Sequence, residues 1–378
     1  MKHQQEYRDP GSVRTLLASL RPRVSRRWRI MEVCGGQTHG LLKHGIGAAL
    51  KEEVELVHGP GCPVCVTPVE IIDQAVQAAL LPGVVLTTFG DMLRVPGNQG
   101  TLSQARTQGG SVRTVYSPID AVAHAAAHPE VEVVFLAVGF ETTAPASALA
   151  LLQADRLQLK NFSLLTSHVR VLPAMRVLLE QNASGIDAFL AAGHVCTITG
   201  YEEYRELAQA FRKPIAITGF EPLDLLRGLR ACLELLEQGD IDVVNCYARS
   251  ARPEGNESAR ALLHQVFQVV DTPWRGMGVL PAGGYALREE WRSFDARLRL
   301  DLGETSPTRD CSACRSVEVL QGLIKPTECA AFGKECQPDH PLGAPMVSSE
   351  GACAAYYHYH EVPAMSASGQ AVLSWEST

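Results

Sequence analysis

Short apolar runs alternate with helix-like stretches along most of the chain, from about residue 28 to about residue 279. The runs are WRIMEV (28–33), VELV (54–57), GVVLTTF (83–89), VRTVY (112–116), EVVFLAV (132–138), FSLLT (162–166), PIAIT (214–218) and IDVVNC (241–246). Helical patterns fall between several of them, at 70–81, 145–153, 172–181 and 223–238. Short, nearly continuous apolar strands separated by helices are typical of parallel sheets covered on both faces. The pattern predicts an α/β fold, and eight or more strands suit two sheets better than one.

Two features of the chain suggest its division. VVFLAVGFETTAP (133–145) and PIAITGFEPLD (214–224) both read as a strand followed by Gly-Phe-Glu and then proline, which favours two similar α/β units. After residue 303 the alternation stops, and five of the eleven cysteines follow within about forty residues. A small irregular segment buries little apolar surface and usually needs a metal or a cross-link. We therefore predict α/β domains at 28–150 and 151–300, with exchange of segments between them left open, and a third domain at 301–378.

Composition excludes several classes of function. The formal charge of −7 argues against a general nucleic-acid binder, which needs lysine and arginine to neutralise phosphates. The polar N-terminus lacks the apolar region of a signal peptide, and the most apolar long stretch, 131–152, is interrupted by Glu132, Glu141 and Pro145. We therefore expect a cytoplasmic protein that does not span a membrane. Clustered cysteines in that compartment more often bind metal or do redox work than form structural disulfides.

The cysteines near the C-terminus carry the strongest chemical signal. Their spacing is Cys-x14-Cys-x6-Cys-x16-Cys, formed by Cys314, Cys329, Cys336 and Cys353. Four thiolates suit a [4Fe–4S] cluster, which takes one for each iron. Structural zinc also takes four cysteines, but usually as two close pairs, and only Cys311 and Cys314 make such a pair. The spacing favours the cluster, with Cys311 as a possible substitute for Cys314.

A second signal is GPGCPVCVTP, residues 59–68, in which Cys62 and Cys65 are separated by Pro-Val. Two thiols at this spacing can form a disulfide with little rearrangement. A helical sequence follows, and a helix N-terminus lowers the pKa of a thiol there because its dipole favours the thiolate. The alternative is a Gly/Pro-rich turn with two buried cysteines. The three prolines and two glycines of the loop favour redox or metal use.

A third signal is CGGQTHG, residues 34–40, directly after the first predicted strand. A Gly-rich turn at the carboxyl end of a parallel strand is where α/β proteins place their sites. Neither GxxxxGK[ST] nor GxGxxG is present, so the turn is no phosphate or dinucleotide loop. Cys34 and His39 suit metal ligation, or the roles of nucleophile and base. A histidine hydrogen-bonded within the loop is the alternative for His39.

Three further loops place polar groups at strand ends. TFGDMLRVPG (88–97) contributes Asp91 and Arg94, and GFETTAP (139–145) contributes Glu141. Such groups bind anions or relay protons, although helix capping and salt bridging explain each of them equally well. GHVCTITG (193–200) offers His194 in a similar setting. The remaining cysteines, Cys196, Cys232 and Cys246, are expected in the core.

Taken together, these stretches strongly resemble the HypD family of hydrogenase maturation proteins, over about residues 30–355. The resemblance implies two similar α/β domains facing a central cleft, plus a cluster-bearing third domain. It implies a scaffold that, with the small chaperone HypC, builds the Fe(CN)2CO group of [NiFe]-hydrogenases. Cyanide would arrive from HypE, which obtains it through HypF from carbamoyl phosphate.

The resemblance also implies roles for individual residues. Cys34 would bind the iron together with a cysteine of HypC, and Cys62 and Cys65 would be the redox dithiol in the cleft. The cluster ligands would be Cys314, Cys329, Cys336 and Cys353. His39, Asp91, Glu141 and His194 lie in matching motifs and would be further catalytic residues of the site. Two rival interpretations remain: a transferase with Cys34 as nucleophile and His39 as base, and a zinc-stabilised binding protein without a redox role.

Overall fold

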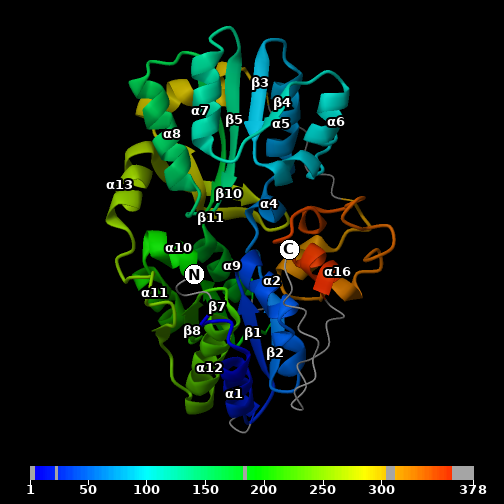
Figure 1. The fold of residues 1–378 in the computed structure, drawn as a ribbon, viewed down its shortest axis with the longest axis vertical. Coiled ribbons are helices and arrows are strands. Elements are labelled where there is room, and N and C mark those ends of the chain that lie inside the picture. The colour runs from blue at the N-terminus through cyan, green and yellow to red at the C-terminus, as the bar shows by residue number, and fades with distance from the viewer. Residues whose placement is uncertain (1–4, 22–23, 182–184, 304–310, 360–378) are drawn as a thin grey trace.

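The computed structural model describes residues 5–21, 24–181, 185–303 and 311–359, and this part of the chain forms two sheets with helices around them (Figure 1). The first, sheet A, has five parallel strands in the order β2-β1-β7-β8-β9. Its strands are β1 (Trp28–Glu32), β2 (Val54–His58), β7 (Ala188–Ala192), β8 (Ile215–Thr218) and β9 (Val243–Asn245). Every residue of the inner strands β7 and β8 is buried, because both faces of the sheet are covered.

The second, sheet B, has six strands in the order β10-β11-β6-β5-β3-β4. Four of them are parallel, and the hairpin β10–β11 adds to the edge of β6 in antiparallel orientation. The strands are β3 (Val84–Thr88), β4 (Val112–Thr114), β5 (Glu132–Gly139), β6 (Phe162–Val169), β10 (Phe267–Trp274) and β11 (Gly278–Leu287). The predicted α/β class with parallel sheets is therefore confirmed.

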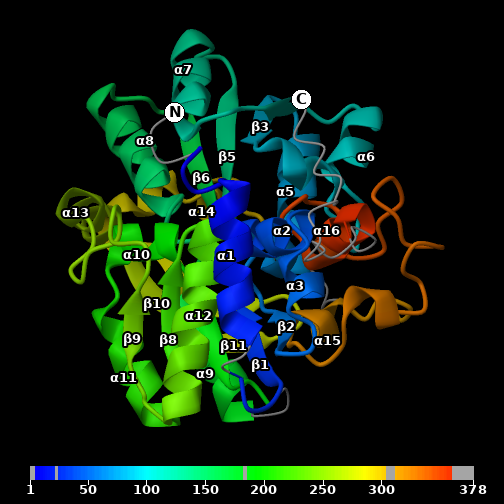
Figure 2. The ribbon, with the colours of Figure 1, turned by 60° about the horizontal axis from the view of Figure 1, so that its bottom comes forward.

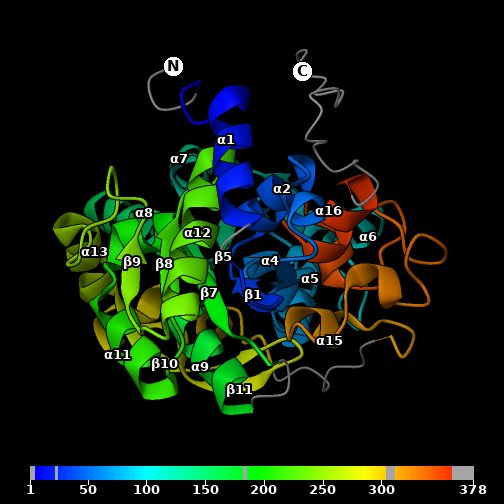
Figure 3. The ribbon, with the colours of Figure 1, turned by 90° about the horizontal axis from the view of Figure 1, so that it is seen from below.

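Helices cover both faces of each sheet. On sheet A, α1 and α12 lie side by side over one face (Figures 2 and 3), while α9 and α11 pack on the other. On sheet B, α5 and α6 cover one face, and α7, α8 and α13 cover the other. The helices of these two layers are α1 (Pro10–Leu20), α2 (Gly35–Lys43), α3 (Ile46–Ala49), α4 (Pro63–Val66), α5 (Val69–Leu80), α6 (Leu102–Thr107), α7 (Pro118–Ala127), α8 (Ala144–Arg156), α9 (Val171–Gln181), α10 (Gly193–Thr199), α11 (Glu202–Phe211), α12 (Pro222–Gln238), α13 (Glu257–Val266) and α14 (Ala296–Arg299), with the 3₁₀ helices η2 (Gly90–Arg94) and η3 (Glu289–Phe294).

Both sheets take strands from both sides of residue 150. Sheet A combines β1 and β2 with β7, β8 and β9, whereas sheet B combines β3 to β6 with β10 and β11. Residue 150 itself lies inside α8. The sheets therefore exchange segments along the chain, the possibility that the sequence left open. The domain boundaries at 150 and 300 stay predictions.

The C-terminal segment, residues 311–359, lies against α2 and α4 at the side of the two sheets (Figures 1 and 2). It contains only short elements: α15 (Ser316–Leu320), η4 (Pro326–Glu328), η5 (Ala344–Met346) and α16 (Ala352–Tyr359). Its own apolar core consists of four buried residues: Ala331, Cys336, Met346 and Ala354. A core this small contributes little stability by itself.

Candidate functional site

The two N-terminal cysteine turns lie at the carboxyl ends of neighbouring parallel strands. Cys34 follows β1 and is the N-cap residue of α2, and Cys62 follows β2 and is the N-cap residue of α4. Glu32, the last residue of β1, pairs in register with His58, the last residue of β2. The sequence predicted each turn at a strand end, and the pairing of β1 with β2 brings the two turns together.

Backbone contacts join these two turns. The Gly35 N–H donates to the Gly61 carbonyl at 2.9 Å, and the Gly59 N–H donates to the Glu32 carbonyl at 2.8 Å. Gly61 has no room for a side chain, because a Cβ there would lie 2.2 Å from the Cys34 nitrogen. This close approach explains why the second turn needs glycine directly before its first cysteine.

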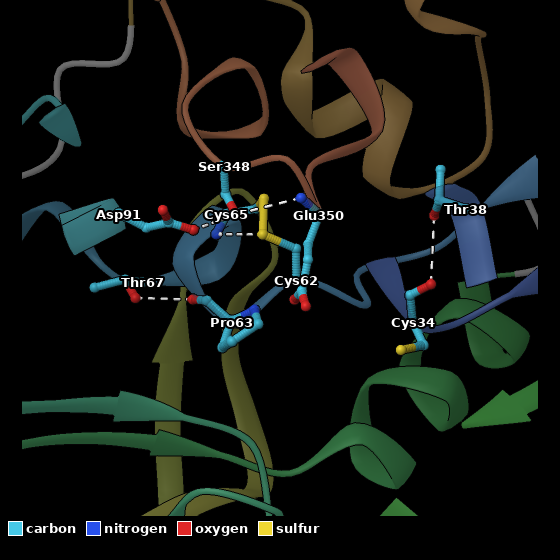
Figure 4. Close-up of a disulfide and its surroundings, with 9 residues drawn as sticks. All are labelled: Cys34, Thr38, Cys62, Pro63, Cys65, Thr67, Asp91, Ser348 and Glu350. Atoms are coloured by element: carbon cyan, nitrogen blue, oxygen red, sulfur yellow. Dashed lines mark hydrogen bonds between the residues drawn. A yellow bond between two sulfur atoms is a disulfide. The ribbon is translucent and has the colours of Figure 1, made fainter. Parts of the chain in front are cut away.

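Cys62 and Cys65 form a disulfide, and both are buried. The Cys65 N–H also donates to the Cys62 sulfur at 3.2 Å. In the view of Figure 4 the disulfide has Asp91 and Ser348 on one side and the Cys34 turn on the other. The 3₁₀ helix η5 of the C-terminal segment packs on α4. The two cysteines of this loop are thus close enough to form a disulfide, as the Cys-x-x-Cys spacing predicted.

The sulfur of Cys34 lies in a buried and partly aromatic environment. Both ring nitrogens of His194 are 4.0 Å from it, and the Phe220 ring lies 4.9 Å from the His194 ring. Burial lowers the pKa of His194 to about 4, so its ring is neutral at physiological pH. Burial raises the pKa of the Cys34 thiol, and the carboxylates of Glu350 and Glu32 raise it further. N–H groups at the start of α2 oppose this shift more weakly.

His39 and Asp91 instead contact the C-terminal segment. The His39 ring lies 4.9 Å from that of Tyr359 in an edge-to-face arrangement, and Asp91 accepts a 2.6 Å hydrogen bond from the Ser348 hydroxyl. Arg94 donates to the carbonyls of Pro338 and Val347 at 2.8 and 3.0 Å. These three side chains tie residues 338–359 to α2, which carries His39, and to η2, which carries Asp91 and Arg94. The histidine beside Cys34 is therefore His194, not His39.

Glu141 lies apart, at the end of β5, and is 3% exposed. One carboxyl oxygen accepts the Val171 N–H at 3.0 Å, and the other has no hydrogen-bond partner among the described residues. Burial raises the pKa of Glu141 to about 7, against an ordinary value of 4.5. Glu141 lines a separate cavity of about 310 Å³ together with Arg170, Glu203 and Tyr204.

The remaining cysteines lie away from these sites. Cys196 and Cys232 are buried as expected, whereas Cys246 is only partly buried.

Replacing Glu141 with glutamine is expected to stabilise the protein relative to the native chain, by an amount that increases as the pH rises. Between about pH 4.5 and 7 the folded state keeps a proton on Glu141 that the unfolded chain has lost. The free energy of unfolding of the native chain therefore falls across this range, whereas glutamine does not titrate. From pH 5.5 to 8 the gain of Glu141→Gln over the native chain should grow by about 2 kcal/mol. Thermal unfolding midpoints at both pH values measure it, with the exposed Glu130→Gln as control. Parallel pH profiles for the two variants would contradict the buried-carboxyl explanation.

The four predicted cluster cysteines line one cavity in the C-terminal segment. Cys314, Cys329, Cys336 and Cys353 surround it with apolar side chains that include Val319, Phe332 and Met346. In the described part of the chain no three His, Cys, Asp or Glu side chains meet around a single ion position. Cys311 is exposed and does not line it.

The cavity fits a cluster held by four thiolates. Gly343 leaves room for the Cys314 sulfur, since a Cβ at Gly343 would lie 2.4 Å from that atom. The Leu342 N–H points to the Cys336 sulfur at 3.4 Å, a contact that stabilises negative charge on sulfur. Burial and the neighbouring cysteines raise the pKa of Cys353. Bound iron would remove this penalty, because a coordinating thiol is deprotonated by the metal.

Sequence reasoning missed several residues that build the Cys34 site. Glu32, Thr38 and His58 form a buried hydrogen-bonded group beneath the turn, and Phe220 packs within 3.1 Å of where a Gly36 side chain would begin. A charged residue inside the apolar run WRIMEV was the available signal for Glu32. Phe220 belongs to the repeated Gly-Phe-Glu, of which only the first copy was considered as a site.

These features define an α/β protein whose two candidate sites are built mainly from cysteine. Comparison with known proteins identifies the class: the family described as "HypD: Hydrogenase formation hypA family" matches residues 12–360. The Escherichia coli K12 hydrogenase maturation factor HypD is 44% identical over 96% of this chain and 99% of its own length. The HypD proteins of Azotobacter vinelandii (43%; 95% and 97%) and Rhodobacter capsulatus (40%; 95% and 98%) are similar over nearly their full lengths.

The chain therefore belongs to the HypD family of hydrogenase maturation factors, and the resemblance inferred from the sequence is confirmed. None of the described helices is both long and apolar enough to cross a lipid bilayer.

Proposed function

We propose that this chain is the scaffold on which the Fe(CN)2CO group of [NiFe]-hydrogenases is assembled, with Cys34 as a ligand of the incoming iron. One observation carries this proposal: the Cys34 turn and the Cys62–Cys65 turn lie on adjacent strands and are joined by backbone hydrogen bonds. A thiol able to hold iron thus stands next to a pair of thiols able to give up electrons.

Cys34 suits iron that carries cyanide and CO, because such iron favours soft thiolate ligands. As the N-cap residue it lies at the positive end of α2, which stabilises anionic groups. Its buried thiol gives up its proton when a metal binds. The neutral His194 ring and Phe220 border the sulfur, so the iron substrate would be shielded from water.

Cys62 and Cys65 would act as the redox dithiol. The two thiols would reduce the S–C bond of a donor that carries cyanide on sulfur: the pair becomes the disulfide, the donor leaves as a thiol, and cyanide passes to the iron with release of one proton. Cys314, Cys329, Cys336 and Cys353 would hold a [4Fe–4S] cluster, which when bound supplies one-electron redox chemistry beside α4. The packing of η5 on α4 supports this arrangement.

Assembly of this group needs partners. By the resemblance, a HypC-like chaperone would supply a second cysteine to the iron, and a HypE-like protein would supply cyanide, with HypF upstream. This work would take place in the cytoplasm.

The transferase alternative has little support. The ring beside the Cys34 sulfur belongs to a neutral His194, while His39 contacts Tyr359. A zinc-stabilised binding protein would give a colourless chain with zinc in the cysteine-lined cavity.

Anaerobic co-purification with a HypC-like partner, followed by infrared spectroscopy, tests the proposal. We expect bands of iron-bound cyanide and CO that vanish in Cys34→Ala and persist in the matched control Cys232→Ala, a buried cysteine of α12. Cys62→Ala should keep the cluster and lose the bands. Absence of bands in the native complex, despite an intact cluster and a bound partner, would refute the scaffold role. Normal bands in Cys62→Ala would refute the dithiol's part.

A further inference from the structure

A buried carboxyl group holds the backbone of the Cys34 turn. Glu32 is completely buried, and one of its oxygens accepts the Cys34 N–H at 2.9 Å. Its other oxygen accepts the Thr38 hydroxyl, one turn into α2. The same carboxyl thus fixes both the cysteine and the first turn of the helix that follows it.

His58 connects this carboxyl to the C-terminal segment. Its Nδ1 lies 2.7 Å from the Glu32 oxygen that also binds Thr38, and its Nε2 lies 3.0 Å from the Tyr356 hydroxyl. A carboxyl oxygen that already takes the Thr38 hydroxyl is an acceptor, so Nδ1 carries a proton and donates to Glu32, and Nε2 shares one hydrogen bond with the Tyr356 hydroxyl. The side chains of Glu32 and His58 are 0% and 3% exposed, so water cannot readily replace a lost partner.

Tyr356 lies on α16, one helical turn after the cluster cysteine Cys353. The same segment packs closely on the Cys34 turn, since a Cβ on Gly35 would lie 2.2 Å from the Glu350 carbonyl oxygen. An unbroken series of buried hydrogen bonds therefore runs from the helix that carries a cluster ligand to the amide of Cys34. The route is Tyr356, His58, Glu32 and Cys34.

We propose that Glu32, His58 and Tyr356 are positioning residues that hold the Cys34 turn in its iron-binding geometry only while the cluster segment is seated. Buried partners that orient a metal ligand act in this way in many metal sites. The consequence is a checkpoint, because a chain without its cluster would present a loosened Cys34 and accept iron poorly. This inference rests on the proposed role of Cys34, but the well-ordered backbone that it predicts at residues 33–38 exists before any iron binds there.

Hydrogen–deuterium exchange on the anaerobically purified full-length chain, without added iron, tests the proposal directly. In Tyr356→Phe, which removes only the hydroxyl, amide exchange in a peptide covering residues 33–38 should rise about tenfold with the cluster still bound. Tyr357→Phe is the matched control, because that neighbouring side chain is partly exposed and its ring faces Phe332. Exchange within about twofold of the native rate in Tyr356→Phe, with an intact cluster, would overturn the proposal.

Two further arms keep the test decisive. Stripping the cluster from the native chain should raise exchange at residues 33–38, whereas stripping it from Tyr356→Phe should add little, because the connection is already cut. Additive increases would overturn the proposal.

If Tyr356→Phe loses its cluster, the variants His58→Gln and His58→Leu are used instead. The glutamine amide offers a donor and an acceptor and should preserve the protection of residues 33–38, whereas leucine should not. Equal protection in both would overturn the proposal.

Infrared spectra of the same variants with the HypC-like partner separate this inference from the scaffold role. Native bands that weaken several-fold in Tyr356→Phe, alongside faster exchange, support both. Faster exchange in a protein whose native form shows no bands supports the positioning residues and refutes the scaffold role. Native bands unchanged in Tyr356→Phe, without faster exchange, leave the scaffold role standing and refute the positioning residues.

Discussion

Replacing Cys353 with serine is expected to remove most of the iron and sulfide from the purified chain and to loosen residues 311–359. Cys353 lines the cavity with the other three cysteines, and the segment has a core of only four buried residues. A segment of this kind depends on its metal, and structural metal sites contribute several kcal/mol or more to folding. The thermal midpoint of the chain should fall by about 10 °C or more.

Cys311→Ser is the matched control for this experiment. Cys311 is exposed and lies outside the cavity, so its replacement should preserve iron, sulfide and visible absorbance. Metal and sulfide analysis, with limited proteolysis of the C-terminal segment, measures both variants. Full iron content in Cys353→Ser, or its loss in Cys311→Ser, would contradict the ligand set. Stoichiometric zinc without sulfide in the native chain would show that the four cysteines hold zinc and not an iron–sulfur cluster.

Gly61→Ala is expected to displace the Cys34 turn and to prevent ligand-carrying iron from accumulating. The new Cβ would overlap the Cys34 nitrogen at 2.2 Å, the Val33 carbonyl carbon at 2.3 Å and the Cys34 Cα at 2.4 Å. All three are backbone atoms, so no side-chain rotation relieves the overlap. Overpacking of this kind costs about 1–3 kcal/mol or more, which should lower the thermal midpoint by several degrees.

Gly303→Ala serves as control for that substitution, because no atom of the described residues lies within 4 Å of a Cβ at Gly303. Infrared bands of the complex and the thermal midpoint should both remain native in this control. A native midpoint in Gly61→Ala would show that the two turns are not held as tightly as their backbone contacts indicate. A lowered midpoint with native bands would show that the substitution destabilises the protein without preventing iron from binding, and would contradict the second half of the prediction.

Much of the fold follows from local pattern, and its exceptions have physical reasons. All eight predicted strands form, because branched and aromatic residues fill them. The strand β7 was missed because AFLAA is rich in alanine, which has low strand propensity, and only burial between β1 and β8 makes it a strand. The hairpin β10–β11 was missed because Pro273, Pro281 and its glycines read as loop. Pro273 is tolerated on the edge strand β10, and Pro281 falls at the register shift between the two strands.

The candidate site was predicted as separate pieces. Cysteine spacing identified each group because sulfur chemistry depends on local sequence, whereas the partners of the polar loop residues lie far along the chain. Asp91 meets Ser348 across more than two hundred residues, and the Glu32–His58 contact depends on the register of two strands. Neither pairing is encoded in a local pattern. Residue roles that depend on such contacts therefore required the structure.

Because the chain is synthesised from its N-terminus, the exchange of strands between the two sheets decides which sheet can be completed first. β1 pairs with β2 on one side and with β7 on the other, so sheet A remains unfinished while all the parallel strands of sheet B are being made. Until β7 (188–192) emerges, β1 keeps an open edge, and an unpaired strand edge in a nascent chain can pair wrongly. The helix α16, which packs on α2 beside Cys34, is synthesised last among the described elements. On the proposed role of Cys34, iron delivered during synthesis would meet an unfinished site, and charging would follow release of the chain.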